Sequence, residues 1–325
     1  MYNREKVVIA LLVAVALSLP MVVQNPYYLH LFITVYVNAM LGLGFALIYS
    51  TGLVTLGAAA FWGIGAYASA LLVMKGGLSF WLALPLSGLI TAGAASCFGL
   101  VAIRYAGLGF IVFTLLFGFI VERMFGYVPI FGGWGGIIGV PPPDPVSLPF
   151  YGSVQFAGKV PYYYLSLFLL FFTMAALFSL YSSRIGRAWR AIRLDARLAE
   201  AAGVYVFGYR LAAFAIASGF AGLAGSFYAH YSMAVSPEAF GLFKSVHIQV
   251  YAILGGLEYY LVGSLTGSLV FTLLPELLQI NPEIEPYITG GVLILIVIFL
   301  PSGLTGLIRT VSRFVTGFYA LVARR

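Results

Sequence analysis

The sequence predicts an all-α membrane protein, a polytopic bundle of about ten transmembrane helices with both termini on the cytoplasmic side. Hydrophobic residues make up 62% of the 325-residue chain and charged residues only 8%, a composition that excludes a soluble globular domain. Apolar runs of about 17 to 25 residues recur along the chain, which is the length that a helix needs to cross a bilayer. These runs are too long for the strands of a membrane barrel and lack their strict alternation.

Ten apolar stretches are the expected spans. They are Val7–Val23, Leu29–Ser50, Leu53–Met74, Trp81–Ile103, Leu108–Phe125, Pro161–Ser182, Tyr209–Tyr231, Phe243–Leu257, Leu261–Ile280 and Pro286–Leu307. The eighth stretch is short, so a re-entrant helix is an alternative there.

The basic residues predict the orientation of the bundle, because Lys and Arg concentrate on the cytoplasmic side of membrane proteins. With Arg4 and Lys6 inside, an even number of crossings also places Arg104, the basic segment at residues 184–208 and the C-terminal arginines inside. The charge-poor loop at residues 126–160 is then external. The same bias explains the net charge of +7, so nucleic acid is not an expected partner.

The N-terminal stretch is interpreted as a span that is kept and not as a cleaved signal peptide. Basic residues precede it, but Pro20 is followed by the bulky Met21 and two valines, and no small-residue cleavage site follows. The single cysteine, Cys97, lies in an apolar run and allows neither an intrachain disulfide nor a thiolate metal cluster. No metal ion or cofactor is expected.

Glycines are abundant inside the expected spans, and two interpretations stay open for them. In lipid, small residues let helix backbones approach closely, so bundle packing is favoured for any single glycine. The alternative is a bend or a smooth surface along a translocation path. The candidates for packing or for the pathway are Gly57, Gly63, Gly65, Gly255 and Gly256, together with His247 of the eighth span.

The external loop at residues 126–160 is rich in glycine and proline. Its glycines permit positive φ, and the run Pro141 to Pro143 stiffens the exit. A phosphate-binding loop is rejected, because no strand and helix flank the glycines and the loop is expected outside. The segment before Val160 also lacks the first glycine and the hydroxyl of an ATP-binding loop. The candidate residues of this loop are Gly132, Gly133, Trp134 and Gly136.

Few ionisable residues fall inside the expected spans, where they are functional suspects. Glu122 and Arg123 lie near an end of the fifth span, where headgroup contact is favoured, and Glu276 lies late in the ninth. His247 is more typical of a buried hydrogen bond than of a proton relay. The sequence has no paired carboxylates at useful spacing, no His-Glu zinc helix and no serine beside a base, so an enzyme is not expected.

The longest polar stretch, from Arg184 to Gly208, predicts a helix lying at the cytoplasmic face. Its arginines recur every three or four residues, a spacing that lines them along one side of a helix. Gly203 is expected to end that helix. Anionic lipid and a partner protein are both suitable contacts for it, and the residues alone do not choose between them.

Several separated stretches resemble the LivM-type permeases of branched-chain amino acid ABC transporters. The third span, GLVTLGAAAFWGIGAYASALL, is similar to the family's GLLSLGHAAFFGIGAY, with Thr55 and Ala58 replacing serine and histidine. The loop sequence GGWGGIIGVP resembles GGSDGLTGIP, and GRAWRAIRLDARLAEAAGV in the basic segment resembles GRALRAIREDEIAAEALGI. The stretch LGGLEYYLVGSLTGS departs from the family at Glu258 and Tyr259. Together the matches run from about residue 50 to residue 307, in the family's order.

The resemblance implies one ABC-importer permease domain over residues 1–325, located in the cell's inner membrane. Its implied partners are a second homologous permease, two cytoplasmic ATPase subunits that hydrolyse the ATP, and an external substrate-binding protein. Residues 184–208 then form the coupling helix region, where a short helix sits in a groove of the ATPase. The candidate coupling residues are Arg187, Arg190, Arg193, Glu200, Ala201, Ala202 and Gly203.

The mechanism implied is alternating access along a mostly apolar pathway, and three alternatives stay open beside it. Similar permeases serve other amino acids, amides and urea, and the replacements at Ala58, Trp134 and Gly135 fall inside the signatures. A channel or secondary carrier would transport without ATPases, although the chain lacks the series of membrane acids that a proton-coupled carrier needs. A purely structural scaffold would not transport at all.

Overall fold

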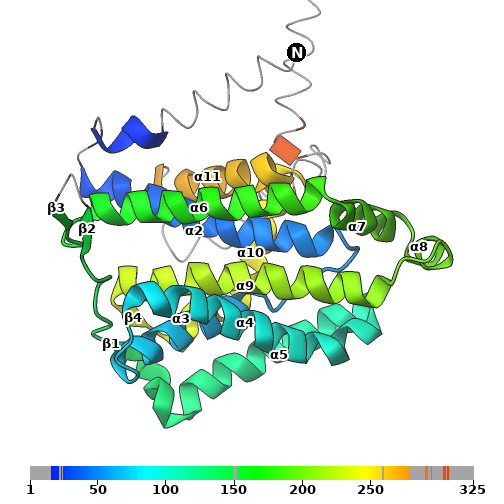
Figure 1. Ribbon diagram of the computed structural model, residues 1–325, viewed down its shortest axis with the longest axis horizontal. Coiled ribbons are helices and arrows are strands. Elements are labelled where there is room, and N and C mark those ends of the chain that lie inside the picture. Colours follow the sequence, from blue (N-terminus) through cyan, green and yellow to red (C-terminus); the bar gives the residue numbers. More distant parts are fainter. Residues whose placement is uncertain are drawn as a thin grey trace, which may run out of the picture.

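The computed structural model describes residues 16–21, 23, 25–148, 152–257 and 260–277, and beyond these only 290, 291, 294, 303, 304 and 306. Within these residues the chain is a bundle of helices that lie side by side and run roughly horizontally in Figure 1. The long helices are α2 (Pro26–Tyr49), α3 (Ala58–Met74), α4 (Phe80–Ala102), α5 (Leu108–Tyr127), α6 (Lys159–Ser182), α9 (Val206–Ser232), α10 (Leu242–Gly255) and α11 (Tyr260–Leu277).

Two helices form the centre of the bundle. α9 packs against α3 and α4 on one side and against α2 on the other, while α2 also contacts α6, α10 and α11. Every residue of α2 from Val35 to Ile48 is buried. This helix has no polar face to turn towards solvent over that stretch, so neighbours must surround it.

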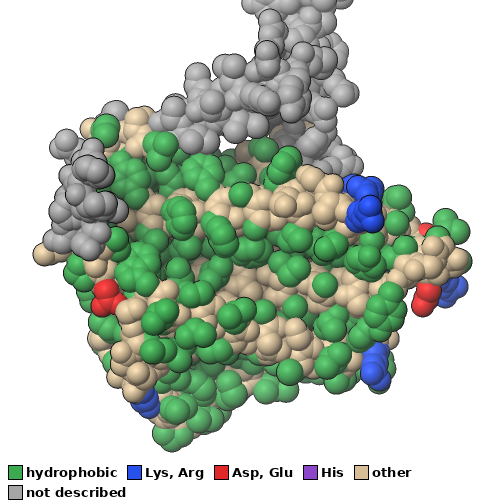
Figure 2. Space-filling model, in the orientation of Figure 1, with side chains coloured by type: hydrophobic (Ala, Val, Ile, Leu, Met, Phe, Trp, Pro, Cys, Tyr) green, Lys and Arg blue, Asp and Glu red, His purple; other side chains and the backbone are tan. Residues whose placement is uncertain are grey.

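The outer helices expose large apolar side chains instead. Leu89 of α4 is 68% exposed, and Leu108 and Ile120 of α5 are 82% and 65% exposed. Figure 2 shows hydrophobic side chains spread over the face of α4, α6 and α9, with charged side chains near the ends of the helices. A helix that is apolar on its outer face is suited to contact lipid chains.

Among the described residues, five helices are long and apolar enough to cross a membrane: α2, α4 with the turn that follows it, α5, α6 and α9. They match the second, fourth, fifth, sixth and seventh predicted spans. The third, eighth and ninth predicted spans correspond to the shorter α3, α10 and α11. The first and tenth spans, Glu258, Tyr259 and the C-terminal arginines fall mostly or wholly outside the described residues. The count of ten and the sidedness therefore stay predictions.

The third predicted span was wrong at its beginning. It was expected from Leu53, but residues 53–57 are not helical and α3 begins at Ala58. Side chains of other helices satisfy this backbone: Leu56 N donates to Thr114 Oγ1 (3.1 Å) and Ala59 N donates to Ser245 Oγ (3.1 Å). Irregular backbone is tolerated at membrane depth only where it is buried in protein and satisfied in this way.

The all-α prediction missed four short strands in the described chain. β1 (Ile137–Ile138) pairs with β4 (Ala234–Val235), and β2 (Val146–Leu148) pairs with β3 (Gly152–Val154), both antiparallel. They satisfy the backbone groups of a long connection. We call the end of the bundle that carries residues 128–148, residues 152–158 and β4 the loop end. The opposite end carries α7 (Arg184–Leu194) and α8 (Ala196–Ala201) and is called the basic end (Figure 1).

Candidate functional site

The basic segment forms two helices, so the prediction of one continuous helix was wrong. α7 ends at Leu194, and Asp195 leaves the helical conformation with φ −156° and ψ 111°. The Asp195 carboxylate accepts hydrogen bonds from Arg197 N (2.8 Å) and Leu198 N (3.0 Å), which makes it the N-cap of α8. The regular arginine spacing continues across this break, so the sequence pattern does not reveal it.

Gly203 ends α8, as the sequence predicted. It has a φ of +86°, in the left-handed region that favours glycine. Val204 N donates to Ala199 O (3.0 Å) and Gly203 N donates to Glu200 O (2.9 Å). This pair of bonds is a Schellman motif, which satisfies the last carbonyl groups of the helix and turns the chain back towards α9.

α7 is anchored firmly to the rest of the bundle. Trp189 is fully buried and its indole N–H donates to Tyr209 O (2.9 Å) at the start of α9. Arg190 donates to Tyr181 O (3.1 Å) in α6, and the Arg193 guanidinium lies 4.4 Å from the ring centre of Tyr49 in α2. Two of the candidate coupling arginines therefore already contact the bundle, whereas Arg187 contacts neither of these groups and is exposed.

The segment beyond α7 is exposed at the far extremity of the basic end (Figure 1). We call residues 196–205 the tip. Glu200, Ala201, Ala202 and Gly203 are all exposed, and Leu198 and Tyr205 are 71% and 69% exposed. The tip thus presents small and apolar groups beside one carboxylate, Glu200, and one guanidinium, Arg197. Figure 2 shows further basic side chains at the same end of the molecule.

The candidate residues of the external loop shape its turns. Gly132, Gly133 and Gly136 have φ values of +81°, +66° and +72°. A Cβ on Gly136 would overlap the carbonyl oxygen of Val235 in β4, so only glycine allows that approach. Trp134 is 38% exposed, and its ring lies 5.2 Å from the Arg123 guanidinium. Arg123 therefore makes its contact at the loop end, outside the helix core.

A cavity of about 280 Å³ lies between α2, α3, α9 and α10, beside the first residue of α6. Its wall includes His30 and Asn38 of α2, Trp62 of α3, Lys159 of α6, Tyr231 of α9 and Lys244 of α10. The start of α2, the start of α6 and the end of α9 all lie at the loop end (Figure 1), which places this polar cavity in the loop-end half of the bundle.

Lys244 holds the inner part of the polar cavity. Its ammonium group donates to Asn38 Oδ1 (3.2 Å) and to the Tyr251 hydroxyl (3.4 Å), and lies 5.3 Å from the Trp62 ring centre. Asn38 is 3% exposed and donates through Nδ2 to Thr272 Oγ1 (3.0 Å) in α11. These bonds join α2, α10 and α11 around one half-buried cation.

The rim of the polar cavity is a second cluster. The Lys159 ammonium donates to the Tyr231 hydroxyl (3.2 Å) and lies 4.5 Å from the same ring's centre. His30 Nδ1 is 2.6 Å from that hydroxyl as well. Sequence reasoning singled out none of these three residues and also missed Lys244. A usable signal existed for Lys244, because it is an ionisable residue inside the eighth predicted span.

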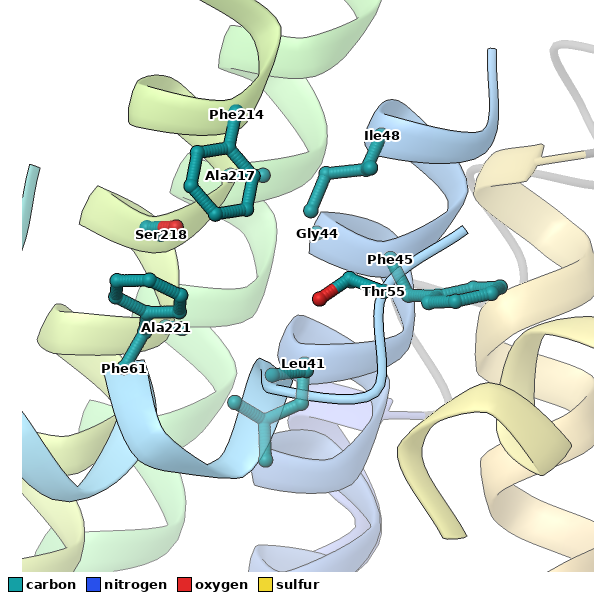
Figure 3. A pocket seen from close by; sticks show the side chains of 11 residues that line it. Leu41, Gly44, Phe45, Ile48, Thr55, Phe61, Phe214, Ala217, Ser218 and Ala221 are labelled. Carbon is teal, nitrogen blue, oxygen red and sulfur yellow. The ribbon is translucent and has the colours of Figure 1, made fainter. Parts of the chain in front are cut away.

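A second, much narrower cavity of about 20 Å³ lies further along α2. Figure 3 shows the side chains around it, from α2, the entry to α3 and α9. Phe61 and Phe214 meet there edge to face, with ring centres 5.2 Å apart. Leu41, Phe45 and Ile48 of α2 line the other wall. Apolar side chains almost fill the space between α2 and α9 at this level.

The glycine candidates lie at close helix contacts. A Cβ on Gly65 would overlap the backbone of Gly222, one on Gly63 would overlap the ring of Phe240, and one on Gly57 would lie 2.5 Å from Thr114 O. Gly255 lies against Gly263 in the same manner, and Gly256 ends α10 with a φ of +106°. His247 packs its ring against Phe271 (5.3 Å). In the described part of the chain, none of these six lines the polar or the narrow cavity, so a pathway role for them stays a prediction.

Metal chemistry has no support from the described residues, among which no group of three His, Cys, Asp or Glu side chains is placed to hold an ion. The arrangement that does exist is a polar chamber in one half of an apolar bundle and an exposed tip at the other end. This arrangement defines the class of helical, multi-pass membrane proteins that carry a chamber within the bundle.

Residues 27–297 match the family described as the permease component of branched-chain amino acid transport systems. The chain is 30% identical to the high-affinity branched-chain amino acid transport system permease protein LivM of Salmonella typhimurium, over 97% of this chain and 78% of that protein. It is 31% identical to the protein of the same name from Escherichia coli, over 83% and 68%. No solved structure matches the chain. The chain belongs to this permease family and is a multi-pass inner-membrane protein.

Proposed function

We propose that this permease is the membrane-spanning subunit of an ATP-driven importer for branched-chain or related amino acids. The observation that carries the proposal is the tip, a short helix that is capped at both ends, packs on α7 and α9 through the buried Ala199, and leaves Glu200, Ala201 and Ala202 exposed. Such a helix fits a groove on a partner protein, because compact side chains let its backbone approach closely. The proposed partner is a cytoplasmic ATPase, with one copy for this chain and one for a second homologous permease.

The connections of the tip support the transmission of force to the bundle. α7 follows α6 after the single residue Ser183, and the Schellman turn at Gly203 leads from α8 into α9. Trp189, fully buried and bonded to α9, fixes α7 between these two long helices. A movement of the tip with its ATPase would therefore displace α6 and α9, which border the polar cavity.

The two cavities suggest how alternating access would operate. In this proposal the loop end faces the external binding protein and the basic end faces the cytoplasm. The amino acid enters the polar cavity from the binding protein, and the narrow apolar level between α2 and α9 separates it from the cytoplasm. ATP binding to the partner subunits would shift the population towards a conformation that opens this level.

The test is co-purification of a candidate ATPase with the permease pair, comparing the wild type with a Glu200→Arg, Gly203→Asp double variant. Both changes lie on the exposed tip. We expect the wild type to retain the ATPase and the double variant to lose it. Because aspartate at a φ of +86° is strained, the single variant Ala201→Arg repeats the test without a change at that backbone position.

The matched control is a Glu238→Arg, Gly158→Asp double variant, which makes the same two changes at exposed positions of the loop end. It should retain the ATPase. If the tip variants bind the ATPase as well as the wild type does, the coupling role is wrong. Transport by the permease in the absence of any ATPase would favour the channel or carrier alternative.

A further inference from the structure

His230, in the last turn of α9, is a fully buried imidazole that lies apart from the tip and from both cavities. We call residues 137–145 the proline loop. His230 Nδ1 lies 2.7 Å from Pro141 O in this loop, and Nε2 lies 3.0 Å from Ser69 Oγ of α3. A carbonyl oxygen can only accept, so Nδ1 is the donor of the first bond. One ring nitrogen of His230 therefore binds the loop, and the other binds a neighbouring helix.

Inside the bundle, the imidazole belongs to a chain of hydrogen bonds. With its hydrogen on Nδ1, the ring accepts at Nε2 from the Ser69 hydroxyl, and the Ser226 hydroxyl of α9 donates to Ser69 Oγ (2.7 Å). Both serines are fully buried. The Phe80 ring of α4 packs against the imidazole edge to face, with ring centres 4.8 Å apart. Contacts from α3, α4 and α9 thus fix the orientation of the ring and hold Nδ1 towards the proline loop.

Backbone contacts join the end of α9 to the proline loop as well. Gly139 N and Val140 N donate to Met233 O (3.0 and 3.1 Å), and β1 at the start of the loop pairs with β4, which follows α9. Met233 has a φ of +56°, in the left-handed region that residues other than glycine seldom adopt. A residue keeps such a conformation when the surrounding contacts over-determine it, so this junction is a firmly held part of the fold.

The far end of the proline loop is fixed to α4. The Asp144 carboxylate accepts from Phe80 N (2.9 Å), and the Asp144 carbonyl accepts from Trp81 Nε1 (3.1 Å). The loop is therefore held between the first turn of α4 and the last turn of α9, while Ile138 is 76% exposed and Pro142 is exposed too. A partner that binds this surface would meet a pre-ordered backbone, which lowers the entropy cost of association.

We propose that His230 is a positioning residue that couples the proline loop to α9, so that an external binding protein bound to the loop acts on the helix that follows the tip. α9 is one unbroken helix of 27 residues, about 40 Å long. Its first turn accepts the Trp189 bond and its last turn holds His230. A rigid helix with fixed contacts at both ends can transmit a displacement between them. The inference rests on the proposed function and adds the route from the binding protein to the ATPase.

The first measurement follows the proline loop in the assembled transporter in lipid vesicles. A spin label on Ile138→Cys, combined with Cys97→Ser to remove the single native cysteine, reports how mobile the loop is. His230→Ala should raise that mobility. His230→Asn should keep it low, because the shorter amide can place its donor near the position of Nδ1 and still bind Pro141 O. His230→Gln reaches instead towards Ser69 and should resemble His230→Ala.

The second measurement is the ATPase activity of the same vesicles with and without the loaded binding protein. We expect stimulation in the wild type and in His230→Asn, and a loss of about five- to tenfold of that stimulation in His230→Ala and His230→Gln, with basal activity retained. A purely structural role would make His230→Asn and His230→Gln alike. Ser69→Ala is the matched control, because it removes the donor to Nε2 and leaves the bond to Pro141, so it should keep most of the stimulation.

Three results would overturn the proposal: unchanged loop mobility in His230→Ala, equal stimulation in His230→Asn and His230→Gln, or a wild type that the loaded binding protein does not stimulate. Because ATPase retention is measured in the same samples, failure of the His230 coupling is distinguished from failure of the transporter assembly. A permease that retains its ATPase but gives one of these results leaves the role of the tip standing.

Discussion

The two cavities along α2 differ in size and chemistry although one face of one helix lines both. His30, Thr34 and Asn38 are spaced by four residues and therefore share a face of α2, where the cavity is about 280 Å³. Leu41, Phe45 and Ile48 continue along the helix, and there the cavity is about 20 Å³. Within three residues the lining changes from polar to apolar.

A bundle of apolar helices can therefore contain a chamber and a closure together. Hydroxyl, amide and ammonium groups interact with water and ions, so the polar level accommodates a hydrophilic ligand. At the apolar level, Phe61 of α3 and Phe214 of α9 contact each other and fill the space beside α2 (Figure 3). Thr55 and Ser218 add two hydroxyl groups to this wall, so water or an amino acid would have to give up most of its polar partners to pass it.

The largest effect is expected from Phe214→Ala, which removes a ring from the narrow level. Phe214 is fully buried. Its ring centre lies 5.2 Å from that of Phe61 and 5.5 Å from that of Phe110. The loss of a buried aromatic ring should lower the free energy of unfolding by about 3–5 kcal/mol. It should also let L-leucine cross vesicles without ATP, measured by efflux of the radiolabelled amino acid.

Phe110→Ala is the matched control for the closure. Phe110 is as deeply buried as Phe214, but it does not line the narrow cavity. Its loss should lower stability by a similar amount, read from thermal unfolding in detergent, without ATP-independent efflux. Equal efflux from both variants would show that the leak follows general loosening, and the closure would not be specific to the narrow level.

The next effect is expected from Asn38→Asp, which adds a carboxylate beside the Lys244 ammonium. Asn38 lines the polar cavity, with its Oδ1 3.2 Å from Lys244 Nζ, so the new carboxylate would lie at the cavity wall and repel the carboxylate of an amino acid substrate. The KM for L-leucine in ATP-driven uptake should rise about tenfold or more.

Thr272→Val is the control at this site, since it removes only the acceptor of the Asn38 amide. It should cost about 1 kcal/mol of stability and leave the KM nearly unchanged. An Asn38→Asp transporter with the wild-type KM would contradict the proposal that the amino acid enters the polar cavity.

Much of the helical framework was predictable because hydrophobic length is a local property of the sequence. The predicted stretch Leu108–Phe125 ends two residues before α5 does, and Pro161–Ser182 begins two residues after α6 does. Gly203 was recognised as a stop from its residue type alone. Asp195 was equally available as a helix N-cap, but the regular arginine spacing across it concealed the break.

The remaining features depend on contacts between distant segments. Residues 53–57 are as apolar as a helix, but their irregular backbone is held by side chains far along the chain, among them Thr114, which accepts from Leu56 N, and Gln249, which donates to Thr55 O. The polar cavity likewise exists because α2, α3, α9 and α10 meet, although the period of four along α2 was visible in the sequence. Periodicity gives the face of a helix but not the partner that it meets.

The smallest effect is expected from Trp62→Phe, and the buried Trp189 provides a comparison for it. The Trp62 N–H has no partner among the described residues, whereas the Trp189 N–H donates to Tyr209 O (2.9 Å). Removing an unsatisfied donor offsets the loss of ring contacts with Tyr228 and Lys244, so Trp62→Phe should change the free energy of unfolding by less than about 1 kcal/mol.

Trp189→Phe should cost more, about 1–3 kcal/mol, because it leaves the Tyr209 carbonyl without that donor. Thermal unfolding of both variants in the same detergent gives the comparison. If Trp62→Phe is the more destabilising of the two, its indole N–H has an acceptor in the protein, and the polar cavity has no spare donor there. If Trp62→Phe is stable but raises the KM for L-leucine a few-fold, the indole contributes a hydrogen bond to the substrate inside the cavity.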